Sequence, residues 1–264
     1  MYEIDILIQG FPGKAVCHGG LGWSTVSLIR GAGRTILLDV GAFGVRRELG
    51  KQLRARGVAP EDVTDVVLTH AHYDHAVNFT LFPEATVWIG AKELAWALEQ
   101  GAGFNPLPEL YVRELSCSPR VRRIEGGQEF LPGLHAIAAP GHTPGHLIFL
   151  LTATSPPFLF SGDAAKNRAE LLSRQADSTV DLEASQSSLD LIWRIWRAEP
   201  GTILVPGHDL CMTLDADGRP VYLGERRAAI AAWFNESLFE ESVINLCQSH
   251  GADLFTSLIS QNTP

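Results

Sequence analysis

The 264-residue sequence has few charged residues, and those it has are unbalanced toward acid. Only 19% of the residues are charged, and 30 acidic residues against 21 basic ones give a formal charge of −9. A surface of this sign repels phosphate backbones, so we expect no nucleic-acid partner. No apolar run approaches the ~18 residues that cross a bilayer, and the first residues are acidic where an export signal is basic. We therefore expect a cytoplasmic protein with no membrane partner.

Cysteine is also scarce, and its spacing is not that of a disulfide scaffold or of a C-x-x-C site. We interpret the four residues as free thiols in a reducing compartment: Cys17, Cys117, Cys211 and Cys247. A chain of this length buries a sizeable core without such staples. No linker of biased composition divides it, so we expect one domain over residues 1–264, as a monomer or homodimer.

Short β-rich runs alternate with helical patterns in both halves of the chain. Strands are expected over residues 4–8, 25–29, 35–40, 65–68, 86–89, 134–138, 146–151, 158–160 and 202–205. Helices are expected over residues 45–56, 91–100, 187–198 and 225–246. Strand-rich blocks with interspersed helices favour an α/β layered sandwich over a pure βαβ array.

The segment Thr69-His70-Ala71-His72-Tyr73-Asp74-His75 follows an apolar strand directly. Imidazole nitrogens are good ligands for zinc, iron or manganese, and an i, i+2 pair at a strand end aims both rings the same way. His70 and His72 can therefore share one ion. Asp74 and His75 lie where the chain can turn and offer them to a second ion. The alternative is a solvated histidine-rich loop, which this spacing disfavours.

Three later segments each place a histidine or aspartate after an expected strand. These residues are His142 in Gly141-His142-Thr143-Pro144-Gly145-His146, Asp163 in Ser161-Gly162-Asp163-Ala164, and His208 in Val205-Pro206-Gly207-His208-Asp209. Loops gathered at one end of a sheet are where a site assembles from distant segments. Each residue alone is typical of a structural role, but together with the histidine cluster they are candidate metal ligands.

The sequence thereby resembles the metallo-β-lactamase fold superfamily. That family's H-x-H-x-D-H signature is matched without a gap from His70 to His75, and its later single-residue motifs are matched in order. The resemblance implies a four-layer αβ/βα sandwich with two divalent metal ions, zinc being expected and iron or manganese the alternatives. It assigns His70, His72 and His142 to one ion, Asp74, His75 and His208 to the other, and Asp163 to a bridge between them. It also places Asp39 behind the ligands, orienting one by a hydrogen bond; we interpret His146 as a structural residue or a second supporting residue.

The resemblance and the donor set both imply hydrolysis by a hydroxide held between the ions. Asp74 and Asp163 are then the catalytic carboxylates. Asp74 is also the best-placed group to carry a proton to the leaving group. The expected activity is cleavage of a small-molecule ester, lactone or thioester. A phosphodiesterase with the same metals, or a non-catalytic metal-containing protein that binds a ligand or signals, remains the alternative.

The closest resemblance is to the N-acyl homoserine lactonase and glyoxalase II-like branch, with one departure. Those lactonases usually place a tyrosine three residues after the bridging aspartate, whereas this chain has Lys166 there. Lys166 could donate to a substrate carbonyl or carboxylate, or belong to a solvated basic face. Trp23, in a glycine-rich loop, could cap an apolar group of the substrate or serve as a core anchor.

Overall fold

The structure is a computed structural model that describes residues 2–18, 20–104 and 106–247. Contacts divide the chain into two compact units, Met1–Gly224 and Glu225–Pro264. Within the described part of the chain, no helix has both the length and the apolar character needed to span a membrane.

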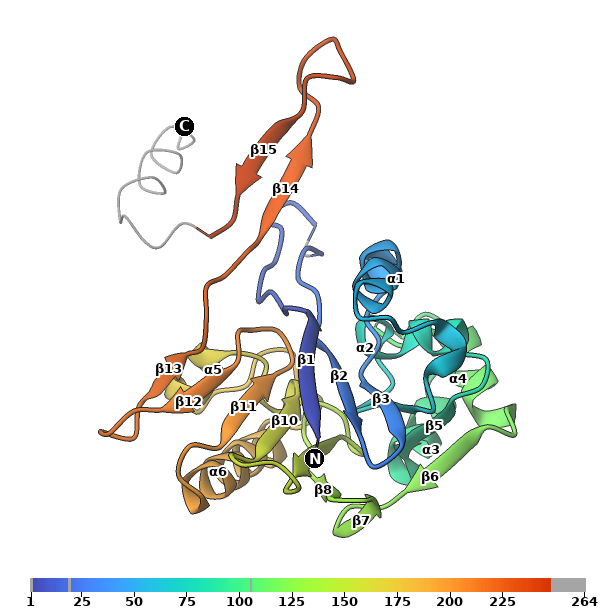
Figure 1. The fold of residues 1–264 in the computed structure, drawn as a ribbon, viewed down its shortest axis with the longest axis vertical. Helices are drawn as coiled ribbons and strands as arrows, with labels where there is room; N and C mark the ends of the chain where they lie inside the picture. Colours follow the sequence, from blue (N-terminus) through green and yellow to red (C-terminus); the bar gives the residue numbers. More distant parts are fainter. Residues whose placement is uncertain (1, 19, 105, 248–264) are drawn as a thin grey trace. The chain divides into compact units, whose positions relative to one another are not determined.

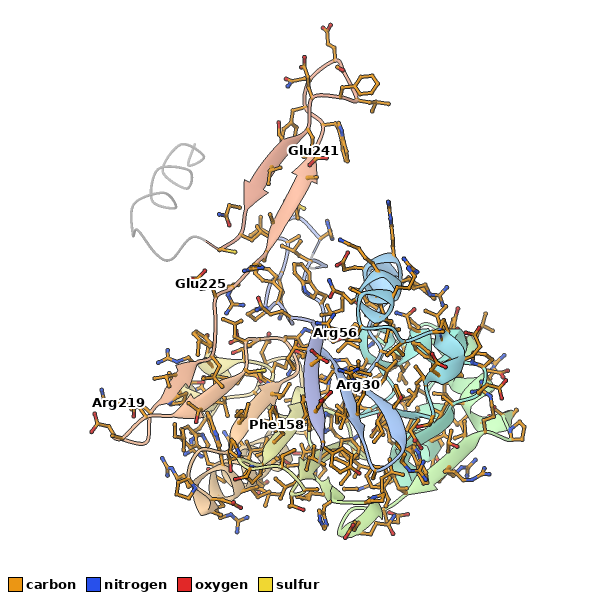
Figure 2. All side chains as sticks on the ribbon, viewed as in Figure 1. Arg30, Arg56, Phe158, Arg219, Glu225 and Glu241 are labelled. Carbon is orange, nitrogen blue, oxygen red and sulfur yellow. The ribbon has the colours of Figure 1, made fainter. Side chains whose placement is uncertain are left out.

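The first sheet has six strands, in the same order in space as in sequence. They are β1 (Glu3–Ile8), β2 (Val26–Gly31), β3 (Arg34–Leu38), β4 (Asp65–Val67), β5 (Thr86–Gly90) and β6 (Val121–Ile124). The first three are antiparallel, and β3 to β6 run parallel to one another. Figure 2 labels Arg30 of β2 and Arg56, which follows α1 (Arg46–Ala55); their guanidinium groups pair with Asp5 of β1 at 3.4 and 3.2 Å.

The second sheet has seven strands, in the order β13-β12-β11-β10-β9-β8-β7. They are β7 (Gln128–Leu131), β8 (Leu134–Ala138), β9 (Leu147–Leu151), β10 (Phe158–Gly162), β11 (Ile203–Pro206), β12 (Met212–Leu214) and β13 (Pro220–Tyr222). Only β10 and β11 are parallel neighbours, so their carboxyl ends meet at one edge of the sheet.

Helices cover the outer faces of the two sheets (Figure 1). Those of the first half are α1 (Arg46–Ala55), α2 (Tyr73–Ala76), α3 (Ala91–Glu99) and α4 (Glu109–Cys117), and those of the second half are α5 (Arg168–Ser173) and α6 (Leu182–Ala198). Short 3-10 turns occupy η1 (Phe43–Val45), η2 (Pro60–Asp62), η3 (Val77–Leu81) and η4 (Asp163–Ala165). This arrangement is the expected αβ/βα sandwich.

Three apolar layers hold the sandwich together, and single strands contribute to two of them. Leu37 of β3 packs in the layer between the first sheet and α1, α3 and α4, whereas Ile36 and Leu38 face the layer between the sheets. Because side chains alternate along a strand, an unbroken apolar run such as this one marks a strand buried on both faces. In the third layer, Trp193 and Trp196 of α6 pack behind the second sheet.

The expected helix over residues 225–246 is wrong. That segment forms two antiparallel strands, β14 (Ala229–Ala232) and β15 (Ser242–Asn245). The polar run Asn235-Glu236-Ser237 interrupts the apolar pattern at the turn, and the β-branched pair Val243-Ile244 favours extended backbone. Elsewhere α6 begins at Leu182 because the Asp181 side chain caps it, accepting a hydrogen bond from the Ala184 amide.

Candidate metal centre

The histidine cluster lies on the segment that leaves the carboxyl end of β4. His70 and His72 occupy non-helical backbone after the strand, and α2 then turns the chain so that Asp74 and His75 follow. His70, His72 and His75 are all buried, and their rings pack together, with the His70 ring centroid 4.4 Å from that of His72 and 4.3 Å from that of His75.

The second sheet supplies the remaining three candidates. His142 lies on the loop between β8 and β9, while Asp163 and His208 directly follow the parallel strands β10 and β11. The Asp163 carboxylate lies between the others, because Oδ1 is 3.2 Å from His208 Nε2 and 3.1 Å from His75 Nε2, and Oδ2 is 3.3 Å from His142 Nε2. A side chain at Gly207 would collide with Oδ1, since its Cβ would lie 2.3 Å away.

All seven predicted ligands therefore come together at one edge of the sandwich. Their donor atoms form three overlapping groups, each with its atoms within 4.8 Å of one another: His70, His72 and His142; His70, His75 and Asp163; Asp74, His75 and His208. The first and third groups correspond to the two ligand sets that the family resemblance implies. Asp163 reaches both, which is the position of a bridging carboxylate.

The hydrogen bonding of this cluster fits metal ions. Among buried side-chain atoms, His70 Nε2 makes no hydrogen bond. Two pairs of imidazole nitrogens also face each other, His72 Nδ1 and His142 Nε2 at 2.9 Å and His75 Nε2 and His208 Nε2 at 3.3 Å. A buried polar atom left without a partner costs about 1–3 kcal/mol, so the unpaired His70 Nε2 and the close approach of these nitrogens need an explanation. Divalent cations ligated by these atoms would provide it, and imidazole with carboxylate is a usual donor set for zinc.

Electrostatics distinguishes the candidate ligands. Burial lowers the pKa of His70 and His142 well below the usual value and that of His72 to about 4, so these imidazoles are neutral at pH 7. Burial also disfavours a charged His75, but the surrounding carboxylates, Asp163 foremost, outweigh it and raise the pKa of His75 well above its usual value. A position that holds a proton so strongly also attracts a cation.

Asp39 supports His75 from behind. It follows β3 with a left-handed backbone (φ 52°), a conformation that aspartate tolerates better than most residues. Its Oδ2 lies 2.8 Å from His75 Nδ1, and its Oδ1 accepts a hydrogen bond from the Thr69 amide at 2.9 Å. With Nδ1–H donating to Asp39, the lone pair of His75 is on Nε2, the atom that faces Asp163.

His146 lies behind the Asp163 carboxylate. Its Nε2 accepts a hydrogen bond from the Asp163 amide at 3.0 Å, and burial lowers the pKa of this imidazole to about 3. Sequence reasoning missed two further supports. The Ser178 carbonyl lies 2.9 Å from His142 Nδ1, and the Ser24 hydroxyl donates to the Asp74 carbonyl. Both act across long sequence separations, so no local motif marks them.

A cavity of about 240 Å³ opens beside these ligands. His72, Asp74, His142, Asp163 and His208 form one part of its lining, and Lys166, Asn167, Asp177 and Ser178 with the loops 11–14 and 20–22 form another. A larger cavity of about 550 Å³ lies over α6, between Arg174, Trp193 and Arg197, and includes none of the seven candidate ligands. Chemistry at the candidate ligands is therefore reached through the smaller cavity.

The two candidate substrate contacts differ in their placement. Lys166 lines the cavity, but its side chain is only 12% exposed, so it does not belong to a solvated basic face. Its ammonium group donates to Glu170 Oε1 at 3.2 Å and to the Asp177 carbonyl at 2.7 Å. Trp23 stacks on Phe11 with ring centroids 4.8 Å apart, and its indole N–H donates to the Gln9 carbonyl at 2.7 Å. These contacts fit a core anchor, one of the two roles that the sequence left open; the other, capping the substrate, stays a prediction.

The sequence profile of the metallo-beta-lactamase superfamily matches residues 19–208 of this chain. The chain belongs to the metallo-beta-lactamase superfamily. All seven candidate ligands lie inside the matched region. The expected class, a metal-dependent hydrolase, agrees with this family and with the lactonases among its relatives.

Individual superfamily members share part of the sequence and most of the fold. Metallo-beta-lactamase domain-containing protein 1 from Xenopus laevis is 29% identical over 214 residues, which cover 78% of this chain and 79% of the relative. An N-acyl homoserine lactonase from Bacillus sp is 28% identical over 160 residues, only 60% of either chain.

Two solved structures of lactonases share the fold. A dizinc quorum-quenching lactonase superposes with a TM-score of 0.65 at 17% identity, over 86% of this chain and 92% of its own. A quorum-quenching N-acyl homoserine lactone lactonase gives a TM-score of 0.62 at 19% identity, over 79% of this chain and 91% of its own. Identities this low show the common fold and leave the substrate of this chain open.

Proposed function

We propose that this superfamily member is a dinuclear metallohydrolase that cleaves a small-molecule ester, lactone or thioester. The observation that supports it most strongly is the position of Asp163, whose two carboxylate oxygens face different histidines of one buried cluster. The residues that would hold the ions are His70, His72 and His142 for one, Asp74, His75 and His208 for the other, and Asp163 for both. We propose zinc as the metal, with iron or manganese as alternatives; a dizinc lactonase among the structural neighbours supports this choice.

A pair of divalent cations supplies Lewis acidity and ionises water near neutral pH. The chain itself holds the donors in place and moves protons. Asp74 Oδ2 lies 3.3 Å from His208 Nε2, and the Asp74 side chain is 15% exposed and lines the cavity. A carboxylate placed at the boundary between ligands and cavity can accept a proton from the attacking water and deliver it to the leaving group.

Lys166 is our candidate for recognising the substrate. Two hydrogen bonds hold its ammonium group at the cavity wall, and an ammonium has three donors, so a third remains for a substrate carbonyl or carboxylate. A cavity of about 240 Å³ is smaller than the roughly 300–1,000 Å³ of pockets for drug-sized ligands, so it favours a small substrate. We propose a small-molecule substrate and no nucleic-acid or membrane partner on this basis and on the net charge of −9. Cytoplasmic location, and assembly as a monomer or homodimer, remain predictions.

The test combines metal analysis with a turnover panel. The substrates are p-nitrophenyl acetate, a homoserine lactone, S-lactoylglutathione and bis-p-nitrophenyl phosphate. We expect two equivalents of metal, turnover of at least one of the first three substrates, and loss of that turnover on treatment with EDTA. Turnover of the phosphodiester alone would replace the proposal with a phosphodiesterase, two bound ions without turnover would favour a non-catalytic protein, and failure to bind two ions would contradict the site itself.

A further inference from the structure

Glu93 is a buried carboxylate that belongs to neither group of candidate ligands. It lies in the first turn of α3, and none of its surface is exposed. A buried carboxylate is costly unless hydrogen bonds satisfy it. Burial raises the pKa of Glu93 to about 7, against the opposing effect of three hydrogen bonds. The partners of these hydrogen bonds indicate what the residue does.

The three donors come from the two loops that carry His70, His72 and His142. Glu93 Oε1 accepts a hydrogen bond from the Ala71 amide at 3.0 Å, and Ala71 lies between His70 and His72. Glu93 Oε2 accepts from the Thr143 hydroxyl at 2.7 Å and from the Gly145 amide at 3.2 Å, on the loop that begins beside His142. One carboxylate therefore connects segments that are 72 residues apart in sequence, from Ala71 to Thr143.

The backbone around Glu93 is built for this close approach. A Cβ on Gly145 would lie 2.0 Å from the Glu93 nitrogen and 2.3 Å from its Cα, and a Cβ on Gly90 would lie 2.8 Å from the Gly145 carbonyl oxygen. Only glycine lets the loop after His142 pack directly on the first turn of α3 at these distances. The loop is consequently seated against the helix by backbone contact as well as by the Glu93 side chain.

The other group of ligands has a different support. Asp39 contacts His75, and the Asp209 side chain accepts hydrogen bonds from the Leu210 and Arg168 amides beside His208. Glu93 makes its three hydrogen bonds with the loops of the first group. Asp39 also reaches His70, because it accepts hydrogen bonds from the Thr69 hydroxyl, which lies 3.0 Å from His70 Nδ1. Glu93 is the buried carboxylate that joins the His70–His72 segment to the loop of His142.

We propose that Glu93 is a positioning residue that sets the spacing of His70, His72 and His142 and thereby the affinity of that group for its metal ion. The proposal rests on the proposed dinuclear site. Among the described residues, no hydrogen bond or ion pair joins Glu93 to a candidate ligand side chain, so it acts through two loop amides and the Thr143 hydroxyl. Supporting residues of metal sites typically change metal affinity by about 10–100-fold when mutated.

The principal variant is Glu93→Gln, which keeps the shape of the side chain. Its amide oxygen can face only one loop, so its NH₂ group must oppose either the Ala71 amide or the donors of the other loop. We expect zinc to bind to the first group about 10–100-fold more weakly, and to the second group with little change. Competition with a chromogenic chelator measures the affinities of both zinc ions. The variants His72→Ala and His208→Ala each remove a ligand from one group, so they show which affinity belongs to which group.

Two controls separate positioning from general destabilisation. Asp65 is also a buried carboxylate, at the opposite end of β4, where it accepts hydrogen bonds from Arg34 and the Trp88 indole. Asp65→Asn should lower the melting temperature of the metal-free protein without changing either zinc affinity. Thr143→Val should weaken zinc binding to the first group, as Glu93→Gln does. Thr143→Ser keeps the hydroxyl and should bind zinc as the wild type does.

The outcomes are distinguishable. Unchanged zinc affinities in Glu93→Gln, or equal weakening of both equivalents, would overturn the positioning role. If Glu93→Gln does not fold, the comparison of Thr143→Val with Thr143→Ser decides, and equal zinc affinity in these two would overturn it as well. A wild-type protein that binds fewer than two zinc ions would instead contradict the proposed function.

Discussion

Replacing Asp39 with asparagine should weaken one of the two metal positions without unfolding the protein. Asparagine tolerates the left-handed backbone at this residue (φ 52°), so the substitution adds little strain. Its side-chain oxygen can still accept the Thr69 amide hydrogen bond that Asp39 accepts at 2.9 Å. Its NH₂ group then faces His75 Nδ1, which lies 2.8 Å from the wild-type carboxylate.

That contact reverses the tautomer of His75. An NH₂ donor favours the imidazole with its lone pair on Nδ1 and its proton on Nε2, the atom that lies 3.1 Å from Asp163 Oδ1. A protonated Nε2 cannot bind a metal, so His75 must first adopt its less stable tautomer, and the free energy of that change weakens metal binding. Changes of this kind weaken metal binding by about 10–100-fold, which is about 1.4–2.7 kcal/mol.

The measurement is a zinc titration of Asp39→Asn with a competing chelator, together with kcat on the best substrate of the panel. We expect the affinity for one zinc ion to fall, namely the affinity that His208→Ala also lowers. We also expect kcat to fall when zinc is limiting. Asp65→Asn makes the same chemical change at a buried carboxylate far from the cluster, and it should leave both equivalents unchanged. If Asp39→Asn binds both zinc ions as tightly as the wild type does, Asp39 does not control metal binding through the tautomer of His75.

Three further predictions concern the candidate metal centre and the cavity beside it. Asp74→Asn should lower kcat by about 10²–10⁴-fold, and full turnover with both ions bound would rule out its role in proton transfer. Lys166→Met should raise KM or lower kcat by about tenfold, the loss expected for one charge-assisted hydrogen bond, whereas unchanged kinetics would leave Lys166 only its structural contacts with Glu170 and the Asp177 carbonyl. Burial lowers the pKa of His72 to about 4 and that of His146 to about 3. Below about pH 6.5 these two histidines are therefore protonated in the unfolded chain but remain neutral in the folded metal-free protein. Each of these two histidines therefore destabilises the folded protein in EDTA as the pH falls from 7 to 5, whereas His75 and Glu93, whose pKa values are raised, act in the opposite direction. His146→Asn removes one destabilising contribution, so its melting temperature should fall less, or rise more, than that of the wild type over this range; an equal slope would show that His146 does not contribute.

Local sequence patterns predicted most of the strands and the identity of the candidate ligands. The run Ile36-Leu37-Leu38 marks a strand buried on both faces because its neighbouring side chains enter two different apolar layers. The spacing of His70 and His72 marks a shared site because it is a property of extended backbone, independent of the rest of the fold. Such signals need only a few consecutive residues.

Other features depend on partners that the local sequence does not contain. The segment from Ala229 to Asn245 has enough apolar residues for a helix, but pairing between its two halves makes it a hairpin. Trp23 stacks on Phe11 and donates to the Gln9 carbonyl, and its glycine-rich loop indicates neither contact. Lys166 is held by Glu170 and the Asp177 backbone, which its own tripeptide does not predict.

The sequence by itself determined which chemical groups this protein can offer to a metal and in what order they occur along the chain. Only the tertiary structure decided that these groups meet, since Asp163 joins His75 and His142 through contacts between two sheets. It also singled out Glu93, a glutamate in an ordinary helical segment, as the residue that connects two ligand loops. The physical reason is that hydrogen bonding and burial at such positions depend on segments far apart in sequence, whereas strand periodicity and ligand chemistry are local.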